Sequence, residues 1–251
     1  MTDIVLYERD QAVATVTLNR PESRNAVNKA MCEQLLAAIH RAEDDPQVRV
    51  ILVRGAGSEF CAGADLKERR GKDEAWVRRR RMLGLDTYLA IEKVEKPVVA
   101  LVHGVCVGSG CEIALACDFI VASEDASFRF PEPHWGTVGA TQRLPRAVGK
   151  RLAKDLLFTN RALPAAEAAK LGLVTRVCAT GELDAAGAGV AGDIAKASPL
   201  AISLTKQAVD LGEEVSIAQG VRIEYAAIRH NLAAGDWKEG QERFAARKTD
   251  G

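Results

Sequence analysis

The most constraining feature of the chain is the order of three segments within residues 97–117. Residues 97–102 form an apolar run that begins with a proline, and a strand tolerates proline at its start because little depends on an N–H there. A glycine-bearing turn at residues 108–110 and a mostly apolar run at residues 111–117 follow. This order predicts a buried strand, a tight turn and a buried helix.

Further elements are predicted on both sides of this unit. They are a strand hairpin at residues 3–19, an amphipathic helix from residue 28 to the residue before Pro46, and strands at residues 48–53, 119–122 and 127–130. Strands and helices that alternate in this way indicate an α/β fold.

Composition limits the classes of function that this chain can serve. The chain has 251 residues, 47% of them hydrophobic, with 34 basic and 34 acidic residues. We expect one globular domain, and the zero net charge argues against a dedicated DNA-binding protein. We expect a cytoplasmic protein with no membrane association, because no long apolar run and no leader-like segment is present. No metal site is expected, because the six cysteines lack C-x-x-C spacing and the four histidines are scattered.

The last part of the chain has a helical pattern only. Apolar residues recur there at spacings of three or four, at Ile217, Val221, Tyr225, Ile228 and Leu232. An apolar helical face added to a complete core predicts packing against a partner subunit. We therefore divide the chain into a core of residues 1–197 and a helical oligomerisation region of residues 198–251.

Residues 65–81 are strongly charged, with eight basic and four acidic residues. One interpretation is a helical face in contact with solvent. The other is that some of these cations meet the phosphates of a ligand. The run of four arginines at residues 78–81 also leaves an accessory role in RNA binding open.

Two glutamates have surroundings that suggest chemistry. Glu112 lies three residues after Ser109 in an otherwise apolar helix, where a buried carboxylate must be paired, hydrogen-bonded or protonated. Its simpler role is that of a partner for the helix dipole. Glu132 lies between Pro131 and Pro133, which fix the local backbone, although it is also readable as an exposed turn residue.

Two glycine-bearing turns follow strands, at residues 60–65 and 108–110. Small residues let a ligand approach the backbone, and the N–H groups of such turns can stabilise a developing oxyanion. Glycine alone is a weak signal, so two ordinary turns remain the alternative.

These segments belong to a longer ordered set of motifs. The set comprises Asn19-Arg-Pro-Glu-Ser-Arg-Asn-Ala26, Phe60-Cys-Ala-Gly-Ala-Asp-Leu-Lys67, Pro97-Val-Val-Ala-Leu-Val-His-Gly104, Gly108-Ser-Gly-Cys-Glu112, Ala114-Leu-Ala-Cys-Asp118, Pro131-Glu132, Thr141-Gln-Arg-Leu-Pro145 and Ala168-Ala-Lys-Leu-Gly-Leu-Val174. Together they resemble the enoyl-CoA hydratase/isomerase (crotonase) family, and most closely its enoyl-CoA hydratases. The resemblance implies a spiral of repeated ββα units, with C-terminal helices that build a trimer or a hexamer.

The resemblance also implies an activity. Family members act on acyl-CoA thioesters, whose carbonyl oxygen would accept hydrogen bonds from the backbone N–H groups of Ala64 and Ser109. A hydro-lyase of fatty acid metabolism that adds water to a 2-enoyl-CoA is implied, with Glu112 activating the water and Glu132 protonating Cα. No separate cofactor is expected, because coenzyme A is part of the substrate. By motif position, its binding is assigned to Arg24, Ala26, Ala62, Asp65, Leu66, Lys67 and Lys248.

The chain departs from the family pattern at two places. Ser109 stands where hydratases usually carry glycine, so its side chain must point away from the oxyanion site. The stretch from Glu132 to Thr141 is about three residues shorter than in typical hydratases and carries His134 and Trp135. We expect this loop to narrow or redirect the acyl pocket.

Two other activities remain as alternatives. A double-bond isomerase of the same family can use one glutamate to move a proton. A serine hydrolase of the Clp type would use Ser109 as nucleophile and His134 as base, although Val107 and Cys111 depart from the G-x-S-x-G motif.

Overall fold

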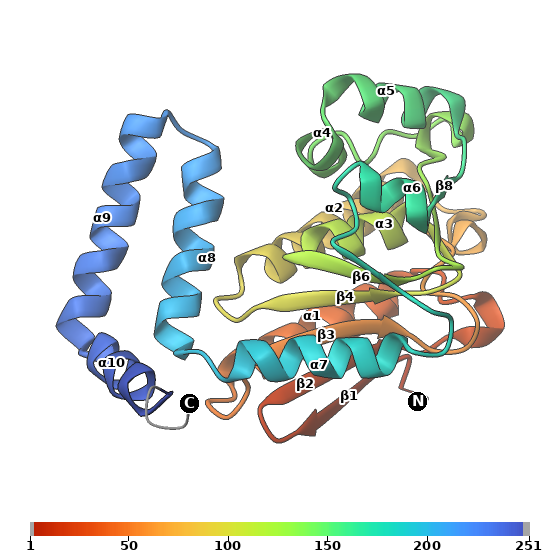
Figure 1. Cartoon of the computed structure of the whole chain (residues 1–251). Coiled ribbons are helices and arrows are strands. Elements are labelled where there is room, and N and C mark those ends of the chain that lie inside the picture. Colours follow the sequence, from red (N-terminus) through yellow and green to blue (C-terminus); the bar gives the residue numbers. More distant parts are fainter. Residues whose placement is uncertain (1–2, 248–251) are drawn as a thin grey trace.

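The computed structural model describes residues 3–247, and its largest sheet has six strands in the order β1-β2-β3-β4-β6-β9 (Figure 1). The first two strands form an antiparallel hairpin, and all later neighbours pair in parallel. The predicted hairpin and the three predicted strands of this sheet are confirmed. The strands are β1 (Val5–Asp10), β2 (Val13–Leu18), β3 (Val50–Gly55), β4 (Val98–Val102), β6 (Phe119–Ser123) and β9 (Arg176–Cys178).

A second, smaller sheet consists of β5 (Val105–Val107), β7 (Ser127–Arg129) and β8 (Leu163–Pro164). The chain passes from β4 to β5 and then into α3 (Ser109–Ala116), and it next passes through β6 and β7. Strands β4 and β6 are neighbours in the large sheet, and β5 and β7 are neighbours in the small one. Successive ββα units are thus stacked side by side, as expected.

Both faces of the large sheet are buried. Alternate residues such as Ile51 and Val53 face one hydrophobic cluster, which includes side chains of α1 (Lys29–Asp44), α2 (Glu74–Lys93) and α3. Their neighbours in β3 face a second cluster beneath α7 (Leu183–Ala195). The parallel strands therefore read as continuous apolar runs.

Local chemistry sets the start of the two long helices. The side chain of Asn28 accepts a hydrogen bond from the N–H of Met31 at 2.8 Å, so the predicted helix begins directly after residue 28. Asp73 caps α2 in the same way through the N–H of Trp76, at 2.7 Å. Shorter elements complete the core: η1 (Pro21–Ser23), η2 (Leu66–Arg69), η3 (Glu132–Trp135), α4 (Arg143–Val148), α5 (Lys150–Thr159) and α6 (Ala165–Lys170).

The charged residues 65–81 do not form one solvated helical face. They divide between η2, a short connection and the first part of α2. Arg80 is buried, with 7% of its surface exposed, so the solvated interpretation is wrong for this residue. The reason is tertiary, because α2 packs along α1 and turns one side of its arginine run inward.

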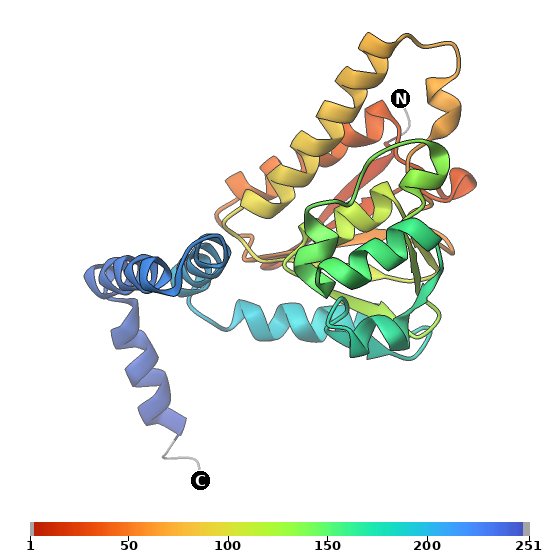
Figure 2. The ribbon, with the colours of Figure 1, turned by 90° about the horizontal axis from the view of Figure 1, so that it is seen from above.

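Three helices stand apart from the sheet: α8 (Pro199–Glu213), α9 (Ile217–Ala234) and α10 (Asp236–Arg247) (Figures 1 and 2). The apolar residues predicted to share one stripe of α9 are all exposed, and Ile217 is 85% exposed. Such a row of exposed large apolar side chains is typical of a docking surface. No helix within residues 3–247 combines the length and apolar character that crossing a membrane requires.

Candidate active site

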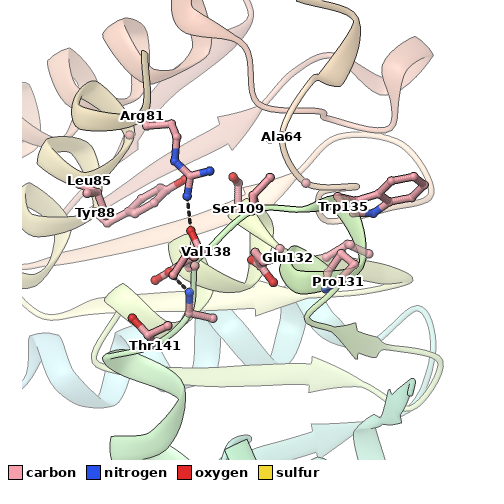
Figure 3. A pocket seen from close by; sticks show the side chains of 18 of the residues that line it. Ala64, Arg81, Leu85, Tyr88, Ser109, Pro131, Glu132, Trp135, Val138 and Thr141 are labelled. Atoms are coloured by element: carbon pink, nitrogen blue, oxygen red, sulfur yellow. Dashed lines mark hydrogen bonds between the residues drawn. The ribbon is translucent and has the colours of Figure 1, made fainter. Parts of the chain in front are cut away.

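A cavity of about 400 Å³ opens between η2, α2, the first turn of α3 and the loop after η3. Both glutamates singled out from the sequence line it, together with Ala64 and Ser109 (Figure 3). Three segments that are distant in the sequence thus bring the four predicted catalytic positions to one place: the turn before η2, the first turn of α3 and η3.

Glu112 is held in a defined orientation in the first turn of α3. Its side chain is 10% exposed, Oε1 accepts a hydrogen bond from the N–H of Ala140 at 2.6 Å, and Oε2 lies 3.1 Å from Nη1 of Arg143. Arg143 in turn makes two hydrogen bonds to the carboxylate of Glu92, at 2.7 and 2.6 Å. A specific cation and a backbone donor therefore offset the cost of burying this carboxylate.

Glu132 has a contrasting environment. Among residues 3–247, nothing donates a hydrogen bond to its buried Oε2. Burial raises the pKa of this carboxyl above its ordinary value, nearby Glu112 raises it further, and Arg81 acts in the opposite direction. One side chain in the cavity is thus a paired carboxylate, and the other favours the protonated acid.

Two glycines make the slot in which the side chain of Glu132 lies. A Cβ added to Gly139 would lie 2.9 Å from Cγ of Glu132, and one added to Gly108 would lie 3.3 Å from Oε1. Gly108 also has a φ of 49°, a conformation that favours glycine.

Two residues that line the cavity have a backbone N–H group without an acceptor in the described part of the chain. The neighbours of Ala64 are bonded to Val27, because Gly63 accepts from its N–H at 2.8 Å and Asp65 donates to its carbonyl at 3.0 Å, whereas Ala64 itself donates to nothing. Ser109 is the first residue of α3, where helical N–H groups have no partner within the helix. These two donors have the character that an oxyanion site needs.

The hydroxyl of Ser109 has a partner on α2. Burial raises the pKa of the Tyr88 phenol, and the neighbouring hydroxyl of Ser109 lowers it. The Ser109 hydroxyl therefore lies next to Tyr88. The backbone N–H of Ser109 has no acceptor among residues 3–247.

Comparisons with known proteins agree with this geometry. The family model described as enoyl-CoA hydratase/isomerase matches residues 8–250. The chain belongs to this family.

Individual relatives extend the family match. The short-chain-enoyl-CoA hydratase of Clostridium acetobutylicum is 36% identical, over 97% of this chain and 95% of its own length. The crystal structure of enoyl-CoA hydratase from Bacillus anthracis superposes with a TM-score of 0.95 and 33% identity, over 98% of this chain and 97% of its own. A crystal structure from Thermobifida fusca YX, solved in complex with CoA, has a TM-score of 0.86 and 29% identity, over 92% and 93% of the two chains. These matches confirm the predicted family, the crotonase fold and an enzyme of hydratase type.

The positions that the family resemblance assigns to coenzyme A lie in different surroundings. Ala62 and Leu66 line the cavity, and Lys67 and Arg24 are exposed near it. Lys248 lies outside the described residues. The remaining described positions, Ala26 and Asp65, both contact Arg20.

Arg20 organises the region next to the entrance of the cavity. Its Nη1 donates to the carbonyl of Ala26 at 2.5 Å and lies 3.1 Å from Oδ2 of Asp65. The Asp65 carboxylate also accepts from the N–H of Lys67 at 3.1 Å and so caps η2. The side chain of Asp65 thus holds this segment in place, whereas any contact of Asp65 and Ala26 with coenzyme A remains a prediction.

The structure argues against the serine hydrolase alternative, because His134 is not placed to act as a base for Ser109. The ring of His134 is hydrogen-bonded through Nε2 to the carbonyl of Phe158 at 2.9 Å, and it does not line the cavity with Ser109. The structure also argues against the RNA-binding alternative, because the arginines at residues 78–81 do not form a continuous exposed surface. Nη2 of Arg80 donates inward to the carbonyl of Val27 at 2.6 Å.

Sequence reasoning did not assign Arg143 or Tyr88 to this cavity, and it named Arg81 only as one cation of the charged run 65–81. Arg143 belongs to the Thr141-Gln-Arg motif, so its motif position was a usable signal. Tyr88 and Arg81 lie in a polar helix where no spacing marks them, and only the packing of α2 brings them to the site.

Proposed function

We propose that this chain is an enoyl-CoA hydratase that reversibly adds water to a 2-enoyl-CoA and forms a 3-hydroxyacyl-CoA. The observation that carries the proposal is that one cavity contains Glu112 and Glu132 in different environments. The same cavity is lined by two residues whose backbone N–H groups have no acceptor among residues 3–247. Hydration needs one carboxylate to take a proton from water and one acid to give a proton to carbon.

The proposed steps follow from these environments. The thioester oxygen accepts hydrogen bonds from the N–H groups of Ala64 and Ser109, which stabilise the negative charge that develops when water attacks Cβ. Glu112, oriented by Ala140 and Arg143, takes the proton of that water. Glu132, whose raised pKa favours the acid, delivers its proton to Cα.

Binding of the CoA part is proposed at the positions that match the family motifs. Arg24, Lys67 and Lys248 would meet phosphates, since cations form strong charge-assisted hydrogen bonds with them. Ala26, Ala62, Asp65 and Leu66 would contact the adenine and pantetheine parts through their backbone. The CoA-bound structure from Thermobifida fusca YX supports this assignment at the level of the fold.

Assembly through the C-terminal helices is part of the same proposal. Residues 198–251 would join copies of the 1–197 core into a trimer or hexamer, and the exposed apolar side chains of α9 support this. Light scattering on the purified full chain should give the mass of three or six copies, whereas a monomer would contradict this part.

The deciding experiment measures water addition to crotonyl-CoA by loss of the enoyl thioester absorbance. Glu112→Gln preserves shape and removes the base, so we expect hydration to fall by about 10²-fold or more. Glu8→Gln, at an exposed position of β1, is the matched control and should hydrate normally. Near-normal hydration by Glu112→Gln would contradict the assigned role. A wild-type enzyme that moves a 3-enoyl double bond and adds no water would be an isomerase.

A further inference from the structure

The cavity has an excess of positive charge that the hydration chemistry does not use. Four arginines and two glutamates line it. Arg143 is paired with two glutamates, and Nε of Arg80 lies 3.2 Å from Oε2 of Glu68. Arg69 and Arg81 form no ion pair with a carboxylate within residues 3–247, although the charge of Arg81 lowers the pKa of Glu132.

Arg81 is fixed with most of its donors unused. Its guanidinium crosses from α2 to the loop after η3 and donates one hydrogen bond to the carbonyl of Val138 (Figure 3). A guanidinium carries five N–H donors, so this half-buried group has several left for a ligand. Val138 lies two residues before Ala140, whose N–H holds Glu112, so Arg81 is tied to the loop that orients the base.

Arg69 is half-buried at the end of η2 and makes no hydrogen bond with its side chain within the described chain. Burial lowers its pKa, and the charges of Arg81 and Arg80 lower it further. These cations therefore repel one another across a partly desolvated space, and an anion placed between them would reverse that cost.

The position of Arg81 favours the acyl end of the substrate over its CoA end. Figure 3 shows Arg81 and Tyr88 on one side of Ser109, and Ala64 on the other. Four of the seven CoA contacts implied by the family motifs adjoin Ala64 in the sequence, at residues 62 and 65–67. A carboxylate on the acyl chain and a phosphate of CoA offer the same chemistry to an arginine, so the experiment has to separate them.

We propose that Arg69 and Arg81 form a carboxylate site in this cavity, and that the preferred substrate is a 2-enoyl-CoA whose acyl chain ends in a carboxylate. This inference rests on the proposed hydration. The substrate is then the monothioester of an unsaturated dicarboxylic acid. A chain that ends in a methyl group leaves both guanidinium groups partly desolvated and without a carboxylate partner, so the site discriminates against it.

The test compares kcat/KM for three substrates: crotonyl-CoA, 5-carboxy-2-pentenoyl-CoA, and the carboxamide of the latter. The last two have nearly the same shape and differ in charge. For the wild type we expect the carboxylate to exceed the carboxamide by about tenfold or more, as charge-assisted arginine pairing allows. Arg69→Gln and Arg81→Gln should each move this ratio towards one. Arg81→Lys should give an intermediate ratio, because lysine keeps the positive charge but lacks the paired N–H donors of the planar guanidinium.

Arg70→Gln is the matched control. Arg70 adjoins Arg69, is exposed and does not line the cavity, so this variant should keep the wild-type ratio. Circular dichroism and thermal melting of each variant report whether it has folded, and Arg81→Lys covers the case in which Arg81→Gln has not.

Each remaining outcome is decisive. Hydration of crotonyl-CoA with a carboxylate-to-carboxamide ratio of one or below overturns this inference and leaves the proposed function intact. Absence of hydration with all three substrates overturns the proposed function. Comparing inhibition by CoA and by 3′-dephospho-CoA tests whether the arginines bind the 3′-phosphate of CoA instead of an acyl carboxylate. If Arg69→Gln or Arg81→Gln weakens only the inhibition by CoA, the arginines bind its phosphate and the inference is wrong.

Discussion

Nη1 of Arg143 lies 3.1 Å from Oε2 of Glu112, and the same guanidinium holds both oxygens of Glu92. The side chains of Arg143 and Glu112 are 12% and 10% exposed. This buried arrangement offsets the cost of placing a carboxylate in an apolar helix and fixes the direction of its side chain. The loop after η3 and the active-site helix thereby depend on one cation.

Arg143→Met should destabilise the protein strongly. It leaves a buried carboxylate without its cation, which costs about 3 kcal/mol or more, and urea denaturation measures this. Arg161→Met is the control, since Arg161 forms more exposed pairs with Asp155 and Glu167, and it should cost about 1 kcal/mol or less.

The double variant Arg143→Met with Glu112→Gln should recover part of this loss, because the unpaired charge is gone. Strict additivity of the two single changes would show that Arg143 and Glu112 do not stabilise each other.

Glu132 should make stability depend on pH. Its pKa is raised in the folded state by burial, above the value of 4.5 that it has when exposed. Stability that is fully present below 4.5 is therefore lost as the pH rises through the folded pKa, since the buried acid must ionise. Glu132→Gln cannot ionise, so it should gain stability over the wild type near pH 8 and lose that gain near pH 4, at about the pKa of an exposed glutamate.

Urea unfolding across this pH range measures the difference between the two proteins. A difference that stays constant with pH would show that the pKa of Glu132 is the same in the folded and the unfolded protein.

Gly139→Ala should lower kcat while the protein stays folded. The added methyl group would lie 2.9 Å from Cγ of Glu132 and displace the acid from its slot. Misplacing a catalytic group by about 1 Å can cost about 10²-fold in rate. Gly189→Ala in α7 meets nothing within 4 Å and should leave kcat unchanged. Steady-state hydration of crotonyl-CoA compares the two variants. Equal rates would contradict the claim that Gly139 leaves the space in which Glu132 is positioned.

Much of the fold could be read from local patterns. The cap at Asn28, the proline before β4 and the apolar repeat of α9 are properties of neighbouring residues, so the elements follow from them. The interpretation of residues 65–81 was wrong at Arg80 for the opposite reason. Its burial depends on how α2 lies against α1, and a charge run carries no information about that packing.

The sequence by itself determined the family, the order of the ββα units and the presence of two glutamates and two small turns, because each is a short contiguous motif. Only the tertiary structure decided that Glu112 is paired with Arg143, 31 residues away, while Glu132 has an oxygen without a donor. It also decided that Arg69 and Arg81 form no ion pair with a carboxylate within residues 3–247. Ion pairing and desolvation depend on which distant segments meet, and that is a property of the folded chain alone.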